Sequence, residues 1–151
     1  MIQLAKVEDS LASAVFDDLA EEPRFDMPPD PFQTSGDLVR WLVYSDCDIV
    51  GYAVCHSIDW VSRRGRGGTW LRAEARGHGI GKAVTTALHA AVFGELNLRR
   101  IEGAVENSNA AQQRILEGLG MRCEGIMRDV AWFNGKYRTF VLYALVRAEV
   151  K

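Results

Sequence analysis

Long hydrophobic runs are missing from this chain of 151 residues. No apolar stretch approaches the ~20 residues that a membrane-spanning helix needs, so we expect no membrane partner. The formal net charge is -2, which argues against general nucleic-acid binding, because such proteins carry a basic patch. The three cysteines, Cys47, Cys55 and Cys123, lack the spacing of metal ligands. Their odd number and the lack of a signal-peptide pattern predict a cytoplasmic protein without a metal.

Proline is scarce, and its four residues all fall between positions 23 and 31. Because proline removes backbone donors and fixes φ, this segment is expected to be an irregular loop, and loops of this length are often functional. Residues 1–37 carry nine acidic and two basic residues, net -7, whereas the remainder carries 11 acidic and 16 basic residues, net +5. This polarity would suit a cationic substrate and an anionic cofactor. A solvated acidic helix face is the simpler interpretation.

Hydrophobic periodicity predicts alternating strands and helices. Strands are expected at Ile2–Val7, Arg40–Tyr44, Ile49–Ile58, Thr69–Arg72, Arg100–Val105, Glu124–Phe133 and Tyr137–Val146, and helices at Ser10–Ala20, Gly79–Phe93 and Asn109–Leu119. Between these elements, Arg63–Gly68 is expected to be a basic, flexible connection, and Asn134-Gly135 predicts a tight hairpin. Residues 69–105 form a parallel βαβ unit between antiparallel hairpins. The expected fold is one α/β domain over residues 1–151, a mixed and mostly antiparallel sheet flanked by helices.

Three glycines alternate in the segment Arg76–Lys82, directly after a predicted strand and at the start of a helix. Glycine lets the backbone turn tightly against a ligand, and the first helical turn offers unpaired N–H groups and partial positive charge. This segment is therefore expected to bind a phosphate group. A nucleotide P-loop would require a glycine at position 76 and Ser or Thr at position 83, where Arg76 and Ala83 stand. A dinucleotide fingerprint would need one more residue between the last two glycines.

The run Arg76-Gly77-His78-Gly79-Ile80-Gly81 resembles motif A of the GNAT superfamily of N-acetyltransferases. Residues 109–125, which begin Asn-Ala-Ala-Gln-Gln-Arg, are similar to a segment of its ribosomal-protein alanine acetyltransferase branch. Residues 70–77, Trp-Leu-Arg-Ala-Glu-Ala-Arg-Gly, resemble the W-L-x-P-E-x-R-G of that branch. The resemblance covers about residues 51–146 and implies an acetyl-CoA-dependent N-acetyltransferase.

In that superfamily the pantetheine arm of acetyl-CoA lies between two diverging strands, and no metal takes part. The resemblance implies that the backbone at residues 71–73 pairs with this arm and that the glycine loop holds the pyrophosphate. The implied cofactor-binding residues are Leu71, Arg72, Ala73, Arg76, Gly77, His78, Gly79, Ile80, Gly81, Lys82 and Asn109. A backbone N–H of the Leu71–Arg72 stretch is the expected donor to the thioester carbonyl.

Familiar catalytic side chains of the superfamily are absent at three positions. The Glu of the alanine-acetylating relatives is replaced by Ala104, the Tyr acid of many members by Leu116, and a Ser by Gln112. Because strand residues alternate, Glu102 shares a face with position 104 and is the candidate base, with an ion-paired structural Glu as the alternative. Tyr143 on the last hairpin is a further catalytic candidate.

A site with a weak base would suit an α-amine, whose pKa of ~7.7–8.0 is far below the ~10.4 of lysine. The acceptor is expected to be a small-molecule or peptide amine: a protein N-terminus, a polyamine, an amino acid or an antibiotic. Two other functions stay open, a non-catalytic acyl-CoA-binding module and a nucleotide-binding protein with an unusual phosphate loop. The chain is expected to be a monomer or a homodimer.

Overall fold

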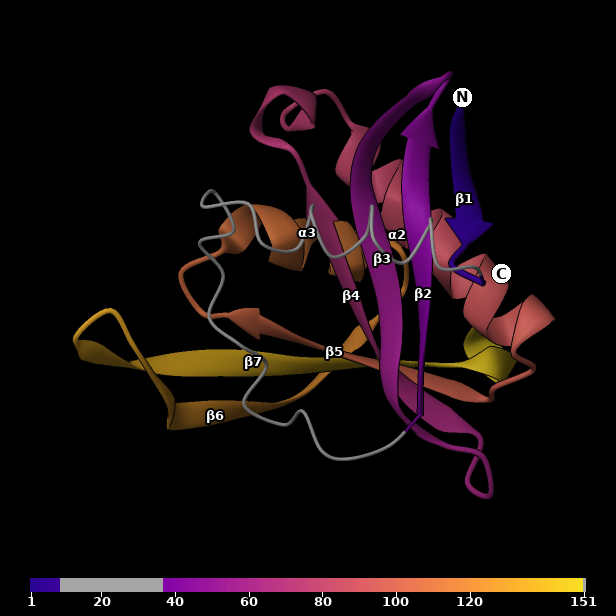
Figure 1. Cartoon of the computed structure of the whole chain (residues 1–151). Coiled ribbons are helices and arrows are strands. Elements are labelled where there is room, and N and C mark those ends of the chain that lie inside the picture. The colour runs from indigo at the N-terminus through magenta and orange to yellow at the C-terminus, as the bar shows by residue number, and fades with distance from the viewer. Residues whose placement is uncertain (9–36, 151) are drawn as a thin grey trace.

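The computed structural model describes residues 1–8 and 37–150, and its described strands form one seven-stranded sheet in the order β1-β2-β3-β4-β5-β7-β6 (Figure 1). The strands are β1 Ile2–Lys6, β2 Asp37–Ser45, β3 Asp48–Asp59, β4 Arg64–Leu71, β5 Arg100–Glu106, β6 Arg122–Phe133 and β7 Lys136–Val146. Helix α2 spans Ile80–Ala90, and helix α3 spans Ala110–Gly118. Every strand pair is antiparallel except β4–β5, which confirms the predicted α/β fold with a mixed sheet. The predicted helix at Ser10–Ala20 and the proline-containing loop lie outside the described residues.

The prediction of a flexible connection at residues 63–68 is wrong, because strand β4 covers almost all of this segment. A Cβ at Gly65 would lie 2.6 Å from Cys55 Sγ, and a Cβ at Gly67 would lie 2.9 Å from Ile101 Cδ1. The two glycines therefore allow β4 to lie directly on core side chains, and they do not serve as hinges. Glycine is depleted in strands on average, so close packing has overridden its local preference here.

Strands β4 and β5 are paired over only three residues each, Arg64–Arg66 with Arg100–Glu102. The parallel unit predicted from residue 69 thus begins earlier in β4. In Figure 1, the axes of β2–β4 are roughly vertical and those of β5–β7 roughly horizontal, so β4 and β5 diverge beyond their paired ends. The later residues of β4, Gly67–Leu71, have no parallel partner on β5. A strand edge with unpaired backbone groups is thereby exposed inside the sheet.

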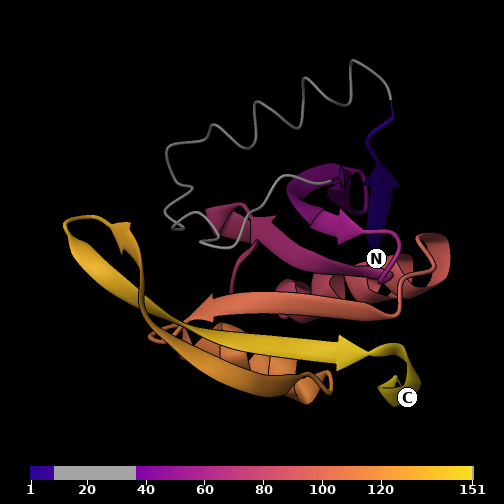
Figure 2. The same cartoon turned by 90° about the horizontal axis from the view of Figure 1, so that it is seen from below.

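The predicted hairpin at Asn134-Gly135 joins β6 to β7. Both turn residues have positive φ, 49° and 76°, as a two-residue hairpin of this type requires. Figures 1 and 2 show the β6–β7 hairpin extending beyond the rest of the sheet. Its antiparallel pairing with β5 closes that end of the sheet and fixes which β7 side chains face the helices.

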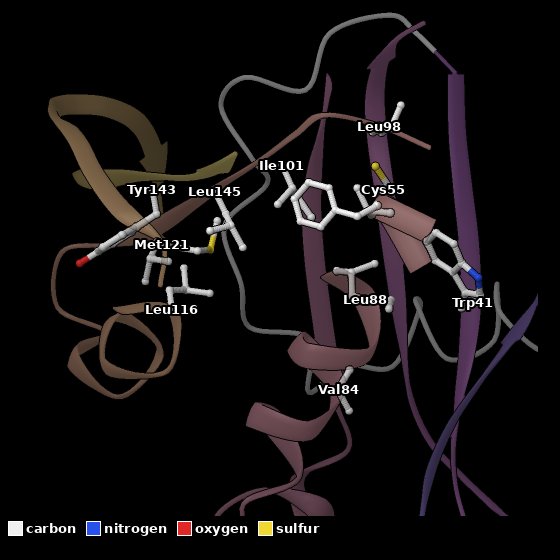
Figure 3. Packing of buried hydrophobic residues seen from close by; sticks show 14 of the residues in the cluster. Trp41, Cys55, Val84, Leu88, Leu98, Ile101, Leu116, Met121, Tyr143 and Leu145 are labelled. Atoms are coloured by element: carbon white, nitrogen blue, oxygen red, sulfur yellow. The ribbon is translucent and has the colours of Figure 1, made fainter. Parts of the chain in front are cut away.

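Helices α2 and α3 cover one face of the sheet, where the main hydrophobic core lies (Figure 3). Leu88 of α2 lies against β4, because its Cδ2 would be 3.2 Å from a Cβ at Gly67. Leu116 of α3 similarly lies against β5, because its Cδ1 would be 3.7 Å from a Cβ at Gly103. Leu88 is 2% exposed, and burial of such a side chain contributes roughly 1.5–3 kcal/mol. These contacts hold both helices beside the divergence of β4 and β5. In the described residues, no helix has the length and apolar character needed to cross a membrane.

Candidate functional site

The glycine loop lies between β4 and α2, at the open end of the diverging strands. Gly77 and Gly79 have φ values of 78° and 76°, a region that L side chains rarely adopt. Gly79 is the N-cap of α2, and no side chain caps the helix. Among the described residues, the first N–H groups of α2 therefore have no side-chain capping acceptor, and they carry the partial positive charge of the helix N-terminus. A Cβ at either glycine would meet no atom within 4 Å, so the space before the loop is open.

Two cations flank this loop. Lys82 is exposed in the first turn of α2, and Arg76 is exposed at the start of the loop. The Arg76 Nε donates to the Leu71 carbonyl at 2.9 Å, which fixes the guanidinium against the end of β4. The loop thus combines unpaired N–H donors, positive charge and open space, which together fit an anionic phosphate group.

The end of β4 provides the second part of the site. The Arg72 N–H donates to the Val50 carbonyl at 2.8 Å, so this N–H faces β3. Backbone direction alternates along a strand, and the N–H groups of Leu71 and Thr69 therefore face the gap toward β5. Ala73, which was predicted to pair with the cofactor, begins a 3-10 turn at residues 73–75. Residues 71–73 were predicted to pair with the cofactor, and of these only Leu71 belongs to strand β4 and its open edge.

A cavity of about 240 Å³ lies where β4 and β5 diverge. One part of its wall is strand backbone, from Gly67–Thr69 of β4 and Ile101–Glu106 of β5. The helices add Thr85, Leu88 and His89 from α2, and Asn109, Gln112 and Leu116 from α3 and its cap. An elongated group entering this gap would contact backbone donors and acceptors and side chains from both helices.

Asn109 lies in the wall of this cavity, as the N-cap of α3. Its side-chain oxygen accepts the Gln112 N–H at 3.1 Å, which accounts for the start of the helix at this point. The three positions where familiar catalytic side chains are absent, Ala104, Gln112 and Leu116, also line the cavity. The structure thus brings all four positions together, although they come from β5 and α3.

Glu102 lines the same cavity, but its carboxylate is enclosed by arginines. Its Oε1 lies 2.9 Å from Arg100 Nε and 4.0 Å from Arg64 Nη1, and its Oε2 lies 3.3 Å from Arg66 Nε. The Glu102 side chain is 13% exposed. Both carboxylate oxygens are therefore engaged, and proton transfer to Glu102 from the cavity would compete with these ion pairs.

Tyr143 is not among the residues that line the cavity. It is 2% exposed, and its hydroxyl donates to Glu117 Oε1 at 2.7 Å. Burial, with a further contribution from Glu117, raises the pKa of Tyr143 to about 12. Figure 3 shows the hydroxyl pointing away from Leu88 and Ile101. The structure does not bring Tyr143 and Glu102 together at one reacting centre.

His89 is a cavity residue that the sequence interpretation missed. It is 8% exposed, and burial lowers the pKa of His89 to about 4, so its ring is neutral at pH 7. The available signal was helical spacing, since Gly81, Thr85 and His89 recur every four residues and so share one face of α2. A Cβ at Gly81 would lie 3.5 Å from Ile115 Cδ1, so this face is turned toward α3.

Comparison with known proteins agrees with this geometry. The family model described as "Acetyltransferase (GNAT) domain" matches residues 14–122. The chain is 32% identical over 108 residues to "Putative ribosomal N-acetyltransferase YdaF" of Bacillus subtilis (strain 168), covering 72% of this chain and 58% of that protein. It is 28% identical over 108 residues to "Uncharacterized N-acetyltransferase p20" of Bacillus licheniformis, covering 72% of this chain and 61% of that protein. The chain thus spans about 60% of the length of these two relatives.

Among solved structures, the fold is similar to the spermidine N-acetyltransferase of Vibrio cholerae in complex with CoA and spermine, with a TM-score of 0.84. That match covers 98% of this chain and 96% of the other at 16% identity, so it supports the fold alone. The family model covers most of the chain, and its match includes the glycine loop and the segment from Asn109. The resemblance noted in these motifs is confirmed, and the chain belongs to the GNAT acetyltransferase family.

Proposed function

We propose that this chain transfers the acetyl group of acetyl-CoA directly to a primary amine. The observation that carries the proposal is the cavity between β4 and β5, together with the uncapped glycine loop at the open end of the same strands. A phosphate site joined to a narrow gap with an exposed strand edge fits an anionic cofactor with a long, amide-containing arm. Bound there, acetyl-CoA would supply an activated thioester carbonyl.

Each part of the site has a proposed role. The N–H groups of residues 77–82 would hold the pyrophosphate, with Arg76 and Lys82 contributing positive charge. The outward-facing N–H groups of Thr69 and Leu71 would bond the pantetheine arm, and one of them would polarise the thioester carbonyl. Asn109 would contact the arm from the opposite wall. The open space at the loop and the cavity wall beside these groups support the proposed roles.

Glu102 is the proposed base. Because arginines bind both of its carboxylate oxygens, we propose that it takes the proton of the amine through an intervening water and not by direct contact. Tyr143 stands as the second catalytic proposal, but its hydroxyl would first have to leave Glu117. A base restrained in this way favours an amine that is already partly neutral. We therefore propose an α-amine acceptor, whose pKa of ~7.7–8.0 leaves a substantial neutral fraction at pH 7.5.

The first test is calorimetric titration with acetyl-CoA, followed by thiol release with a panel of amines. The panel contains a peptide with a free N-terminus, the same peptide with a blocked N-terminus and one lysine, spermidine and an aminoglycoside. We expect the free N-terminus to be acetylated faster than lysine at pH 7.5. Faster acetylation of lysine at that pH would refute the α-amine preference, and failure to bind acetyl-CoA would refute the whole proposal.

A non-catalytic acyl-CoA-binding module is the second candidate. The observation that favours it is the chemistry of Ala104, Gln112 and Leu116, which line the cavity without providing a carboxylate or a phenol. Tight binding of acetyl-CoA without thiol release on any amine of the panel would establish this alternative. Acetyl transfer to any amine of the panel, at a rate above that measured for a variant with a disrupted glycine loop (Gly79→Ala), would exclude this alternative.

A further inference from the structure

The side chain of His89 is buried, lines the cavity and has no partner in the part of the chain that the structure describes. Its 8% exposure comes with no hydrogen bond or ion pair to another described residue. Its ring nitrogens keep some contact with the cavity space, but burial of the residue leaves them little water to bond, which is unfavourable for a polar group. Such a group in a cavity wall indicates that a ligand atom completes its bonding.

Most other polar side chains of the cavity are already engaged. The Thr85 hydroxyl donates to the Gly81 carbonyl at 2.8 Å. Glu106 receives Arg138 Nη1 at 2.7 Å, Glu102 is held by arginines, and the Asn109 oxygen caps α3. Among the described residues, neither ring nitrogen of His89 has a hydrogen-bond partner, whereas these neighbours have theirs in use.

His89 lies beside the point where β4 and β5 begin to diverge. The preceding residue on α2, Leu88, packs against Gly67 of β4. Arg66, the residue before Gly67, is the last β4 residue that pairs with β5. Along the axis of α2, His89 is eight residues beyond Gly81, or roughly 12 Å at 1.5 Å per residue. A pantetheine arm whose pyrophosphate lies at the glycine loop spans this distance when extended. The sulfur end of the arm would therefore lie near His89.

We infer that the His89 imidazole contacts the thioester sulfur of acetyl-CoA and donates a hydrogen bond to it as the sulfur leaves. The inference rests on the proposed function. In the reaction the amine nitrogen forms a bond to the carbonyl carbon, the carbon–sulfur bond breaks, and its electron pair stays on sulfur. The proton lost by the amine ends on that sulfur, which yields an amide and a thiol. His89 stays neutral throughout and stabilises the charge that develops on sulfur. Leu116, which stands where many relatives have a tyrosine, lines the same cavity and provides no such donor.

The decisive experiment is a binding cycle that pairs removal of the His89 donor with removal of the ligand sulfur. Calorimetry measures Kd for CoA and for desulfo-CoA with the wild-type chain and with His89→Leu. We expect the wild-type chain to bind CoA about three- to tenfold more tightly than desulfo-CoA, and His89→Leu to bind both equally. Equal preference for CoA in both proteins would overturn the inference while leaving the proposed function intact. No binding of either ligand to the wild-type chain would refute the proposed function and the inference with it.

Kinetics provides a second test. His89→Leu should lower kcat by about tenfold or more, beyond any rise in KM for acetyl-CoA, which should stay within the three- to tenfold expected from binding, because the donor acts mainly as charge develops. His89→Gln, which retains an N–H donor, should recover most of kcat. A thermal midpoint close to that of the wild type confirms that both variants are folded. If Gln and Leu lower kcat and affinity equally, His89 has a packing role only and the inference fails.

Discussion

Replacing Gly79 with alanine should separate the two reasons for glycine in the loop. Gly79 has a φ of 76° and caps α2, and a Cβ there would meet no atom within 4 Å. The cost in the free protein is therefore backbone strain alone, about 1–2 kcal/mol. The matched control is Gly118→Ala in α3, where a Cβ also meets no atom within 4 Å but φ is not positive. Alanine in a helix should stabilise by about 0.5–1 kcal/mol, so the two variants should differ by roughly 2 kcal/mol.

Urea denaturation measures both changes in the free energy of unfolding, and calorimetry measures acetyl-CoA binding. In the presence of the cofactor, the Cβ at position 79 would occupy space that the pyrophosphate needs. We expect Gly79→Ala to weaken acetyl-CoA binding by more than tenfold, and Gly118→Ala to leave Kd unchanged. If the two variants lose equal stability, φ does not control the cost. If Gly79→Ala binds acetyl-CoA as tightly as the wild type, the pyrophosphate lies elsewhere.

Three further predictions test the polar side chains of Tyr143, Glu102 and His89, of which the last two line the cavity. Tyr143→Phe should cost about 1–2 kcal/mol of unfolding free energy by removing the hydrogen bond to Glu117, and unchanged kcat would exclude Tyr143 as the acid. Glu102→Gln should lower kcat and also cost about 2–3 kcal/mol, since it removes the carboxylate charge that Arg66 and Arg100 bind; a variant as stable as the wild type would contradict the ion-pair geometry seen here. The unfolded His89 takes up a proton near pH 6.5 and the folded one only near pH 4. As the pH is lowered from 6.5 to 4, the unfolding free energy should therefore fall by up to about 3 kcal/mol. His89→Leu should lack this loss while keeping the facing carboxylates Glu102 and Glu106, and identical pH profiles in urea denaturation would contradict the assignment.

The conformation of the glycine loop could be predicted because it depends on the spacing of the glycines. Gly77 and Gly79 had to be glycine for conformational reasons, and a strand–loop–helix context is visible in hydrophobic periodicity. The β6–β7 hairpin was predictable for a similar reason, since Asn134-Gly135 determines the turn locally. In each case the information lies within a few consecutive residues.

Strand β4 was harder to predict, because its first residues alternate arginine and glycine. This pattern lacks the β-branched residues typical of strands. What makes it a strand is tertiary: Gly65 and Gly67 lie on the core, and Arg66 pairs with Glu102 on the other face. No local propensity contains either contact.

Tyr143 illustrates a further limit. Its place on a strand was predicted correctly, but its role depends on which strand lies beside it and which helix covers that face. Pairing with Gly103 of β5 directs the ring under α3, where Glu117 receives the hydroxyl. Strand alternation fixes two possible faces, and only the tertiary pairing selects one.

The proposed cofactor-binding part of the site uses backbone groups, and the proposed catalytic part uses side chains. The two parts therefore differ in how strongly the sequence fixes their positions. Backbone N–H groups bind phosphate and amide whatever the side chain, provided that φ and the strand edge are maintained, so glycine spacing predicts the proposed cofactor-binding part of the site. An acid, base or hydrogen-bond donor needs only to reach the reacting atoms, and any element lining the cavity can supply it. Leu116 on α3 and His89 on α2 line the same cavity from different helices. If His89 acts as proposed, the hydrogen-bond donor comes from α2, and a motif search along α3 would not find it.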